Sequence, residues 1–228
     1  VGRSRAYEKR TLNDRQQQVK VAAEYIAISN RDKRIIAAAA LVLPEFVPIG
    51  VLIGRGIGHV TNDNNAGCQL YVILSPGEGA RETLAAALKA APVASVLIRP
   101  AVGQALGAGE VKPLVEFAQK QNVAVVVQDD AQLARTVRAD GVHLTPGKDI
   151  AARFDAARDI LGRGAIVGID PGVSRHDAME LAEAGADYIA FGAPATLKDR
   201  ERGIEKRDEL IDWWAEIFQV PCVALDVD

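Results

Sequence analysis

Polar and charged residues follow the apolar runs of this sequence, within a few residues of the point where each run ends. In chain order these residues are Ser75, Arg99, Gln128, Asp129, Asp130, Thr145, Lys148, Asp149, Asp170, Ser174, His176, Thr196, Lys198 and Asp226. Cationic side chains and hydroxyl groups bind phosphate oxygens, and carboxylates are the ligands that Mg2+ prefers. The predicted phosphate-binding residues are Arg99, Thr145, Thr196 and Lys198. The predicted magnesium ligands are Asp129 and Asp149, and the whole set suits a small phosphorylated substrate.

Two histidines of the chain differ in their surroundings. His143 alternates with Val142 and Leu144 in an apolar run, which indicates a hydrogen-bonded internal side chain. His176 instead follows a glycine-containing turn at 170–175. Because histidine titrates near neutral pH, His176 is the better candidate for acid-base catalysis.

Several of these candidates also have a purely structural interpretation. Asp129 and Asp130 stand at the start of a helical pattern, where an aspartate often caps the helix. Residues 145–147 read Thr-Pro-Gly, the composition of an ordinary turn, and the charged segment 198–202 is typical of a solvated surface. Residue types alone leave both interpretations open.

Short β-branched runs alternate with amphipathic stretches from residue 69 onward. The runs are 70–74, 95–98, 123–127, 141–144, 165–169, 188–191 and 220–225. Between them apolar residues recur at helical spacing, as at Val111, Leu114, Val115 and Ala118. The alternation predicts parallel strands joined by helices, in a (β/α) barrel or a doubly wound sheet. In a barrel, the polar residues after the strands would meet at one mouth and form the active site.

Two further patterns bear on the choice of architecture. Residues 75–80 read Ser-Pro-Gly-Glu-Gly-Ala, which lacks the Gly-x-Gly-x-x-Gly fingerprint, so we expect no dinucleotide site there. Segments 138–144 and 185–191 both contain an Ala-Asp pair that leads into an apolar run. This repeat fits either architecture, because an aspartate at a helix-to-strand corner suits both.

Composition excludes several classes of protein. The chain has 228 residues, of which 49% are hydrophobic and 25% charged, so a disordered or fibrous chain is not expected. Its formal net charge of -3 argues against a nucleic-acid partner, because affinity for the phosphate backbone depends on clustered Lys and Arg. Cys68 and Cys222 cannot form a disulfide framework, which favours a reducing, cytoplasmic compartment.

The first 68 residues form an N-terminal extension of unknown role in this interpretation, followed by a barrel over 69–228. Residues 35–53 carry a single charge, Glu45, and are long enough for a membrane span. A carboxylate at a bilayer centre costs about 3 kcal/mol, and Pro44 and Pro48 would interrupt the helix, so a buried hairpin or helix is preferred over a membrane tether. Residues 54–68 are rich in Gly, Asn and Asp, which indicates a linker or loop.

The repeat segments resemble a known family. Residues 124–144, Ala-Val-Val-Val-Gln-Asp-Asp-Ala-Gln-Leu-Ala-Arg-Thr-Val-Arg-Ala-Asp-Gly-Val-His-Leu, look like the middle of thiamine phosphate synthase and its relative, the thiazole tautomerase. Segment 185–192 resembles that family's Gly-Ala-Asp-Tyr-Ile-x-x-Gly strand. The resemblance implies a TIM (β/α)8-type barrel that joins a hydroxymethylpyrimidine pyrophosphate to a thiazole phosphate, with magnesium and with release of pyrophosphate.

Residue by residue, the resemblance is partial. It implies substrate contacts for Arg99, Gln128 and Ser174, a metal carboxylate at Asp129, and phosphate contacts with catalytic charge from the loop of Thr196 and Lys198. Residues 97–101 keep the arginine of the family's Gln-Leu-Arg-Glu-Lys and lose its glutamine and lysine. The second metal carboxylate, Asp149, stands one place late in 145–149, and Ser174-Arg175-His176 follows an insertion. The family's phosphate-binding Gly-Gly is replaced near Asp226, whose carboxylate would repel a phosphate.

These departures leave three functions open. The first is an active transferase of the thiamine phosphate synthase type. The second is a catalytically degenerate or tautomerase-like member, with His176 as the proton-transfer group, and the third is a membrane-tethered barrel. We expect a barrel that is incomplete at its C-terminal end, because an eighth strand and helix are absent from the pattern, unless 35–53 supplies the closing strand. An unclosed sheet would expose an edge, which predicts self-association into a homo-oligomer.

Overall fold

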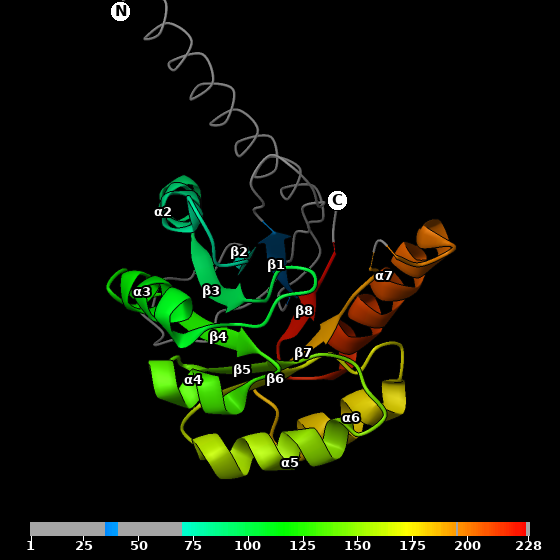
Figure 1. Ribbon diagram of the computed structural model, residues 1–228. Coiled ribbons are helices and arrows are strands. Elements are labelled where there is room, and N and C mark those ends of the chain that lie inside the picture. The colour runs from blue at the N-terminus through cyan, green and yellow to red at the C-terminus, as the bar shows by residue number, and fades with distance from the viewer. Residues whose placement is uncertain (1–34, 41–69, 195, 227–228) are drawn as a thin grey trace, which may run out of the picture.

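Eight parallel strands form a closed barrel among the residues that the structure describes, and helices cover its outside (Figure 1). The structure is a computed structural model that describes residues 70–194 and 196–226, together with the backbone of 35–40. In chain order the elements are β1 (Ile35–Ala40), β2 (Leu70–Leu74), α2 (Ala80–Ala90), β3 (Val93–Ile98), α3 (Ala108–Gln119), β4 (Ala124–Gln128), α4 (Ala131–Val137), β5 (Gly141–Leu144), α5 (Ile150–Leu161), β6 (Ile166–Ile169), α6 (Arg175–Glu183), β7 (Tyr188–Phe191), α7 (Arg200–Ile217) and β8 (Cys222–Ala224).

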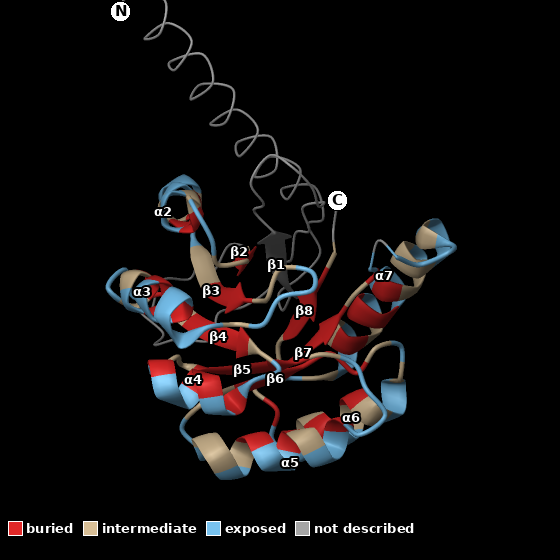
Figure 2. Cartoon of the chain, in the orientation of Figure 1, coloured by how far each residue is buried: buried red, intermediate tan, exposed pale blue. Residues whose placement is uncertain are grey.

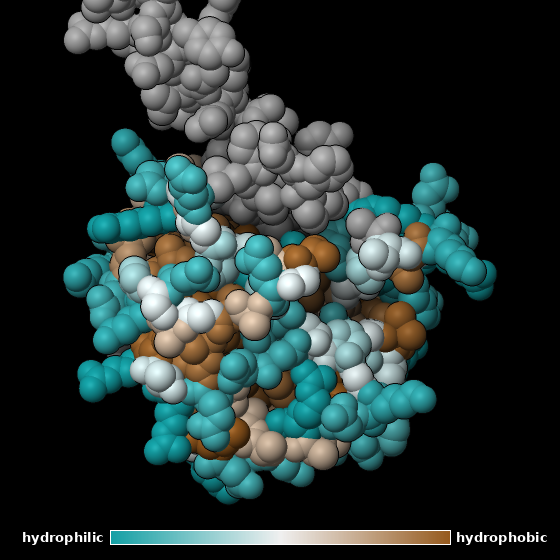
Figure 3. Space-filling model, in the orientation of Figure 1, coloured by the Kyte–Doolittle hydropathy of each residue, from teal (hydrophilic) through white to brown (hydrophobic). Residues whose placement is uncertain are grey.

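The strands form because their residues are β-branched and buried on both faces. In β4, Val125, Val126 and Val127 are all fully buried, as expected for a parallel strand enclosed by helices. Each helix buries only the stripe that faces the barrel, for example Leu84 and Ala87 of α2. Figure 2 shows this pattern as buried strands at the centre and helices that are exposed on their outer faces. The opposite side of each helix is solvated, and hydrophilic side chains dominate the periphery in Figure 3.

The predicted TIM-type barrel is confirmed, and all seven β-branched runs form strands. The closing strand is β1, which pairs in parallel with β2 through Ala37 and Leu70 and with β8 through Ile35 and Cys222. It lies between β2 and β8 in Figure 1. The N-terminal alternative for closure is therefore the correct one. No helix follows β8 within residues 70–194 and 196–226, so the last βα unit lacks its helix there.

The position of β1 corrects two expectations for segment 35–53. Its first six residues form a parallel strand of the barrel, so the preference for a buried hairpin or helix was wrong there. The alternative of a membrane-spanning helix over 35–53 is also wrong for residues 35–40, because they form a strand. No helix among the described residues is both long and apolar enough to cross a bilayer. Residues 41–69, with the predicted linker, lie outside the described residues, as do residues 1–34.

Closure of the barrel also affects the expectations for domains and assembly. The exposed sheet edge from which self-association was predicted does not exist, because β1 pairs on both sides. The predicted boundary between the extension and the barrel was residue 68. The barrel nevertheless includes β1, so one of its strands comes from the segment that was assigned to the extension.

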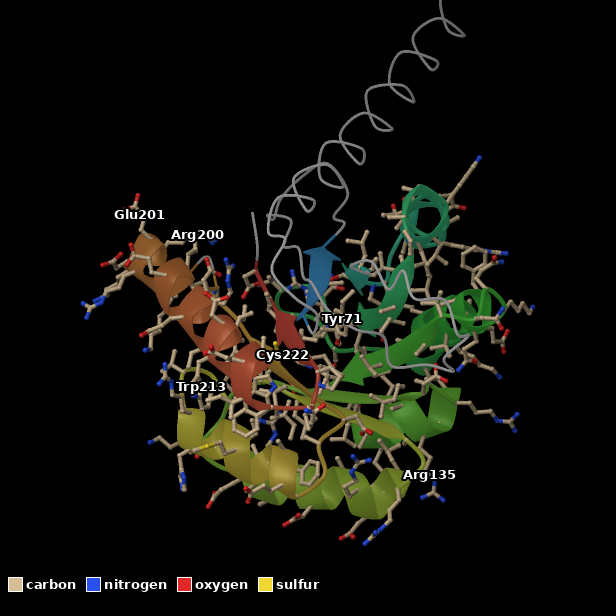
Figure 4. The ribbon with its side chains drawn as sticks, turned by 180° about the vertical axis from the view of Figure 1, so that it is seen from behind. Tyr71, Arg135, Arg200, Glu201, Trp213 and Cys222 are labelled. Carbon is tan, nitrogen blue, oxygen red and sulfur yellow. The ribbon has the colours of Figure 1, made fainter. Side chains whose placement is uncertain are left out.

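A chain of hydrogen-bonded polar groups fills part of the barrel interior. The Tyr71 and Tyr188 hydroxyl groups lie 2.6 Å apart, and the Tyr188 hydroxyl lies 2.9 Å from Nδ1 of His143. The His143 ring stacks on the Tyr188 ring, with the two planes inclined by 11°. Figure 4 shows Tyr71 among the strands. The expectation that His143 is a hydrogen-bonded internal residue is confirmed, and burial lowers its pKa to about 4, so the ring is neutral at pH 7.

The Tyr188 ring requires a glycine on the neighbouring strand. A Cβ atom at Gly168 of β6 would lie 1.8 Å from Cζ of Tyr188, which is far inside van der Waals contact. Any side chain at 168 would therefore displace the Tyr188 ring, whose hydroxyl group links Tyr71 to His143.

Candidate active site at the carboxyl ends of the strands

Asp129 joins the carboxyl ends of β4 and β5. It follows β4 directly, with a φ of 56° in the left-handed region, and its amide donates a hydrogen bond of 2.9 Å to the His143 carbonyl. Its Oδ1 accepts from the Thr145 amide at 2.8 Å, and its Oδ2 accepts from the Thr145 hydroxyl at 2.6 Å. Left-handed backbone in a residue other than glycine is uncommon and concentrates at functional sites. Here it turns the carboxylate of Asp129 towards β5.

The neighbouring aspartate has a different role. Oδ1 of Asp130 accepts from the Leu133 amide at 2.8 Å, so Asp130 caps α4. Asp129 makes no such contact and is therefore not the cap. The structure thus resolves the ambiguity of the Asp-Asp pair, with Asp130 as a structural residue and Asp129 at the mouth.

Arg153 of α5 completes this cluster and was not singled out in the sequence. Its Nη1 donates to the Thr145 carbonyl at 2.8 Å, and its Nη2 donates to Oδ1 of Asp129. The side chains of Arg153 and Asp129 are 27% and 33% exposed, so the pair borders solvent at the mouth. A guanidinium that bridges a carbonyl and a carboxylate fixes the two strand ends relative to α5.

The side of the mouth from β6 to β8 is acidic. Asp170, directly after β6, is 7% exposed, and its Oδ1 accepts from the Gly172 amide at 2.7 Å. The pKa of Asp170 is raised to about 7, mainly by burial; the hydrogen bond from the Gly172 amide opposes this shift, and the charge of Asp226 adds to it. A Cβ at Gly192 would lie 3.0 Å from Oδ2 of Asp226 and 3.5 Å from Oδ2 of Asp170, so both carboxylates approach the end of β7.

Backbone geometry and a buried arginine place Asp226. Its φ of 55° is left-handed, like that of Asp129. Nη1 of Arg207 donates to the carbonyl of Asp226 at 3.0 Å, and the Arg207 side chain also pairs with Asp208. Arg207 is a buried residue of α7, only 5% exposed, so it holds the end of β8 from the helix layer around the barrel. The two carboxylates make this side of the mouth unfavourable for a phosphate group.

Arg99 and Gln128 follow β3 and end β4, as predicted from the sequence. The Arg99 amide donates to the Leu74 carbonyl at 3.0 Å, which ties the ends of β2 and β3 together. Both side chains are partly exposed. The Arg99 guanidinium makes no hydrogen bond or ion pair with any residue that the structure describes, so it is available to an anion.

Ser174 and His176 belong to the first turn of α6. The Ser174 hydroxyl accepts from the Asp177 amide at 3.1 Å and so caps the helix. Nε2 of His176 lies 3.3 Å from Oε1 of Glu180 on the same helix, and the His176 side chain is 74% exposed. The structure therefore gives each residue a local partner on α6, and their predicted roles with substrate stay predictions.

Thr196 and Lys198 lie in the exposed loop between β7 and α7. Asp199 ends this loop by accepting a hydrogen bond from the Arg202 amide at 3.1 Å, which caps α7. In Figure 4 the next residues, Arg200 and Glu201, lie at the far end of α7 from Trp213. The loop stands at the carboxyl end of β7, where the sequence placed it, and no described contact joins it to Asp129.

The structure thus brings Asp129 and Thr145 into direct contact and leaves the other candidates around the mouth. Sequence reasoning missed the role of Arg153 because the residue lies on a helix, not directly after a strand. Its position next to the buried Phe154 was the available signal, because it places Arg153 near the barrel-facing side of α5. The buried state of Asp170 also had no signal beyond its place after an apolar run.

The predicted magnesium ligands do not form an open ligand set. The Asp129 carboxylate already accepts from Thr145 and Arg153. Asp149 is exposed and directly precedes α5. A Cβ at Gly147 would lie 3.0 Å from Nη1 of Arg153 and 3.1 Å from Oδ1 of Asp149, so both side chains approach Gly147. Within the described part of the chain, no three His, Cys, Asp or Glu side chains come together as a metal site. This arrangement does not fit an ion held directly by both carboxylates.

The fold and the mouth define a (β/α)8-barrel protein with its candidate site at the carboxyl ends of the strands, the usual place for catalysis in such barrels. Residues 70–226 match the family model described as thiamine monophosphate synthase. This match covers more than half of the chain and nearly all of its described barrel. The chain belongs to the thiamine monophosphate synthase family.

Individual relatives agree with this assignment. A thiamine-phosphate synthase of Rhodospirillum centenum is 41% identical over 165 residues, which is 69% of this chain and 77% of that protein. One of Erythrobacter litoralis is 44% identical over 116 residues, and this chain spans about half of its length, 53%. Among solved structures, a thiamine phosphate pyrophosphorylase from Pyrococcus furiosus superposes with a TM-score of 0.52 at 26% identity, covering 68% of this chain and 73% of that one.

Proposed function

We propose that this chain is a transferase of thiamine biosynthesis that joins a hydroxymethylpyrimidine pyrophosphate to a thiazole phosphate and releases pyrophosphate. The observation that carries the proposal is the family match over residues 70–226, which includes every residue of the candidate site. The names of the relatives support the same activity. No observation favours the tautomerase-like, degenerate or membrane-tethered alternatives.

The reaction exchanges one bond for another at the methylene carbon of the pyrimidine. The carbon-oxygen bond to pyrophosphate breaks, and the oxygen keeps the electron pair. The ring nitrogen of the thiazole donates its lone pair to the same carbon and acquires the positive charge of a thiazolium. Negative charge develops on the leaving group and positive charge on the pyrimidine, so cations near the former and exclusion of water from the latter favour the reaction.

The basic side of the mouth is the proposed place for the pyrophosphate. Arg99 offers a guanidinium at the end of β3 that pairs with no other described residue, and Arg153 offers its guanidinium beside Asp129. We assign substrate contacts also to Gln128, Ser174 and the Thr145 hydroxyl. Thr196 and Lys198 would bind phosphate from the exposed β7–α7 loop, with Lys198 neutralising the leaving group, and His176 remains the acid-base candidate at the start of α6.

The acidic side of the mouth supports a different role. Asp170 and Asp226 approach Gly192 at the end of β7, where a phosphate would be repelled. Carboxylic groups accept and donate hydrogen bonds, so this side suits the uncharged ring groups of a substrate. The phosphates of both substrates would then lie towards Arg99 and Arg153, and Lys198 would reach them from the exposed β7–α7 loop, which begins beside this acidic side.

Magnesium remains part of the proposal as a companion of the substrate. A pyrophosphate binds Mg2+ through its own oxygens, and Mg2+ usually reaches such sites with several waters and few protein ligands. The ion would therefore enter with the pyrimidine pyrophosphate, and no step of the reaction depends on a set of protein carboxylates that is already formed.

The direct test is an activity assay of the full chain with both substrates and Mg2+, following the formation of thiamine phosphate and pyrophosphate. Asp129→Ala should lower kcat/KM by at least about tenfold, because the ends of β4 and β5 lose their common acceptor. Asp130→Ala, which removes the α4 cap, is the matched control and should affect mainly stability. Binding of both substrates without product would refute the transferase and support a binding or tautomerase role.

Compartment and assembly belong to the same proposal. A reducing, cytoplasmic location is proposed because the two cysteines of the sequence, Cys68 and Cys222, cannot form a disulfide framework. A homo-oligomer is also proposed, although the closed barrel has no open sheet edge to support it. Light scattering of the purified chain measures whether it is a monomer or an oligomer.

A further inference from the structure

Arg153 and Asp129 form an ion pair. Asp129 is a predicted metal ligand, and a metal ligand would need a carboxylate oxygen that is free of such a partner. Nη2 of Arg153 donates to Oδ1 of Asp129, and Nη1 donates to the Thr145 carbonyl at 2.8 Å. Arg153 is thus anchored on both strand ends at once. An arginine with two anchors loses less freedom on pairing than a mobile surface side chain, and its charge is permanent.

Thr145 occupies two further acceptor positions of Asp129. Thr145 donates its amide to Oδ1 at 2.8 Å and its hydroxyl to Oδ2 at 2.6 Å. Oδ1 thus has two donors and Oδ2 has one, so a directly bound Mg2+ would find one open position, on a carboxylate whose charge Arg153 already neutralises. Mg2+ demands nearly ideal octahedral oxygen coordination, so a partly occupied, neutralised carboxylate is a poor ligand.

Asp149, the other candidate ligand, lies near the same guanidinium. Nη1 of Arg153 and Oδ1 of Asp149 approach one point beside Gly147, whereas Asp129 contacts Nη2. Asp129 therefore contacts one terminal nitrogen of the guanidinium, and Asp149 lies in the neighbourhood of the other.

We infer that Arg153 is the resident cation of this mouth: it occupies the position of a divalent ion beside Asp129 and keeps the substrate-free protein from binding one there. Divalent metal then enters only as the complex of the pyrophosphate substrate, and Arg153 is a binding residue for that leaving group. The part of this inference that concerns pyrophosphate rests on the proposed function, whereas the exclusion of metal from the free protein does not.

The test is a Mn2+ titration of the full chain without substrate, followed by the electron paramagnetic resonance of free Mn2+. The wild-type chain should bind Mn2+ only weakly. Arg153→Met should strengthen binding by at least about tenfold, because two carboxylates lose their fixed counter-charge. Arg153→Met combined with Asp129→Asn should return to the weak binding of the wild type.

A matched control is available on the same helix. Arg158 also pairs with an aspartate, Asp187, but at the opposite end of the barrel, so Arg158→Met removes the same charge without creating a metal site. Arg153→Gln, which keeps a donor for the Thr145 carbonyl, replaces Arg153→Met if that variant does not fold.

Three outcomes would overturn the inference. They are tight Mn2+ binding by the wild-type chain, no gain in a folded Arg153 variant, and a gain that persists after Asp129→Asn. A chain that makes no thiamine phosphate but gains Mn2+ binding in the Arg153 variant would refute the proposed function alone. Conversely, synthase activity with unchanged Mn2+ binding in that variant would refute only the role of Arg153.

Discussion

Asp140 and Asp187 make the same two-point contact, each with one residue of the preceding strand. The Asp140 amide donates to the Val125 carbonyl at 2.8 Å, and the Val125 amide donates back to Oδ2 of Asp140 at 2.7 Å. The Asp187 amide donates to the Val167 carbonyl at 3.0 Å, and the Val167 amide donates back to Oδ2 of Asp187 at 2.8 Å. The Ala-Asp repeat of the sequence is therefore a structural device at the amino ends of the strands, away from the mouth.

Asp187→Ala should destabilise the fold by about 1–3 kcal/mol, because it leaves the Val167 amide without its acceptor. Asp187→Asn keeps a side-chain oxygen and should cost less. Urea denaturation followed by tryptophan fluorescence measures both. Because the contact lies at the end of the barrel opposite the site, kcat/KM per folded molecule should stay within about twofold of the wild type. A stable but inactive Asp187→Ala protein would contradict this assignment.

Asp170 should make folding stability depend on pH. Its pKa is raised to about 7 by burial, whereas the same group in an unfolded chain titrates near about 3.9. The folded state therefore binds this proton more tightly, so its contribution to stability is present below about pH 4 and is lost as pH rises towards 7. Asp170→Asn keeps an acceptor for the Gly172 amide and removes this dependence.

Thermal unfolding at pH 5 and pH 8 tests the prediction. The stability of Asp170→Asn relative to the wild type should be higher at pH 8 than at pH 5. Asp226→Asn is a second probe: it removes a charge that raises the pKa of Asp170, so the pH dependence of the wild type should shift to lower pH. An equal difference between Asp170→Asn and the wild type at the two pH values would show that Asp170 does not titrate in this range.

Tyr188→Phe should cost about 1–3 kcal/mol of stability, because Tyr71 and His143 both lose their partner inside the barrel. Tyr71→Phe removes the end of the chain of hydroxyl groups and should cost less, about 0.5–1.5 kcal/mol. Equal effects of the two variants in chemical denaturation would show that the Tyr188–His143 hydrogen bond contributes nothing.

Arg99→Ala should raise the KM for the pyrimidine pyrophosphate by about tenfold or more, because a charge-assisted contact to phosphate is lost. Arg135→Ala is the control, since Arg135 is exposed in the last turn of α4 and points away from the barrel in Figure 4. Titration calorimetry with the pyrophosphate substrate separates binding from turnover. Unchanged affinity in Arg99→Ala would remove this residue from the site.

Local sequence was sufficient to predict seven strands but not β1. The seven runs are rich in Val, Ile and Leu, whereas β1 reads Ile-Ile-Ala-Ala-Ala-Ala, and alanine favours a helix when only local preferences act. Its strand conformation is decided by pairing with β2 and β8, which lie far away in the chain. Pairing partners of that kind leave no periodic signal within the segment itself.

The candidate site was predictable to the extent that it follows strand ends. Asp129 and Thr145 were identified because parallel strands bring their carboxyl ends together. Which of Asp129 and Asp130 caps α4 depended on a left-handed backbone at Asp129, which residue type alone does not determine. The ion pair with Arg153 depends on how α5 lies against the barrel, and only tertiary structure provides that information.

The pairing of β1 with β8 has a consequence for how the protein is made. A ribosome releases β1 long before β8. In the growing chain, the edge of β1 that pairs with β8 therefore stays unpaired until β8 emerges. An unpaired parallel edge is prone to association with other chains, and long-range pairing is slow. We therefore expect nascent chains to depend on holding chaperones until β8 emerges, and removal of β1 to trap the finished chain in that same open form.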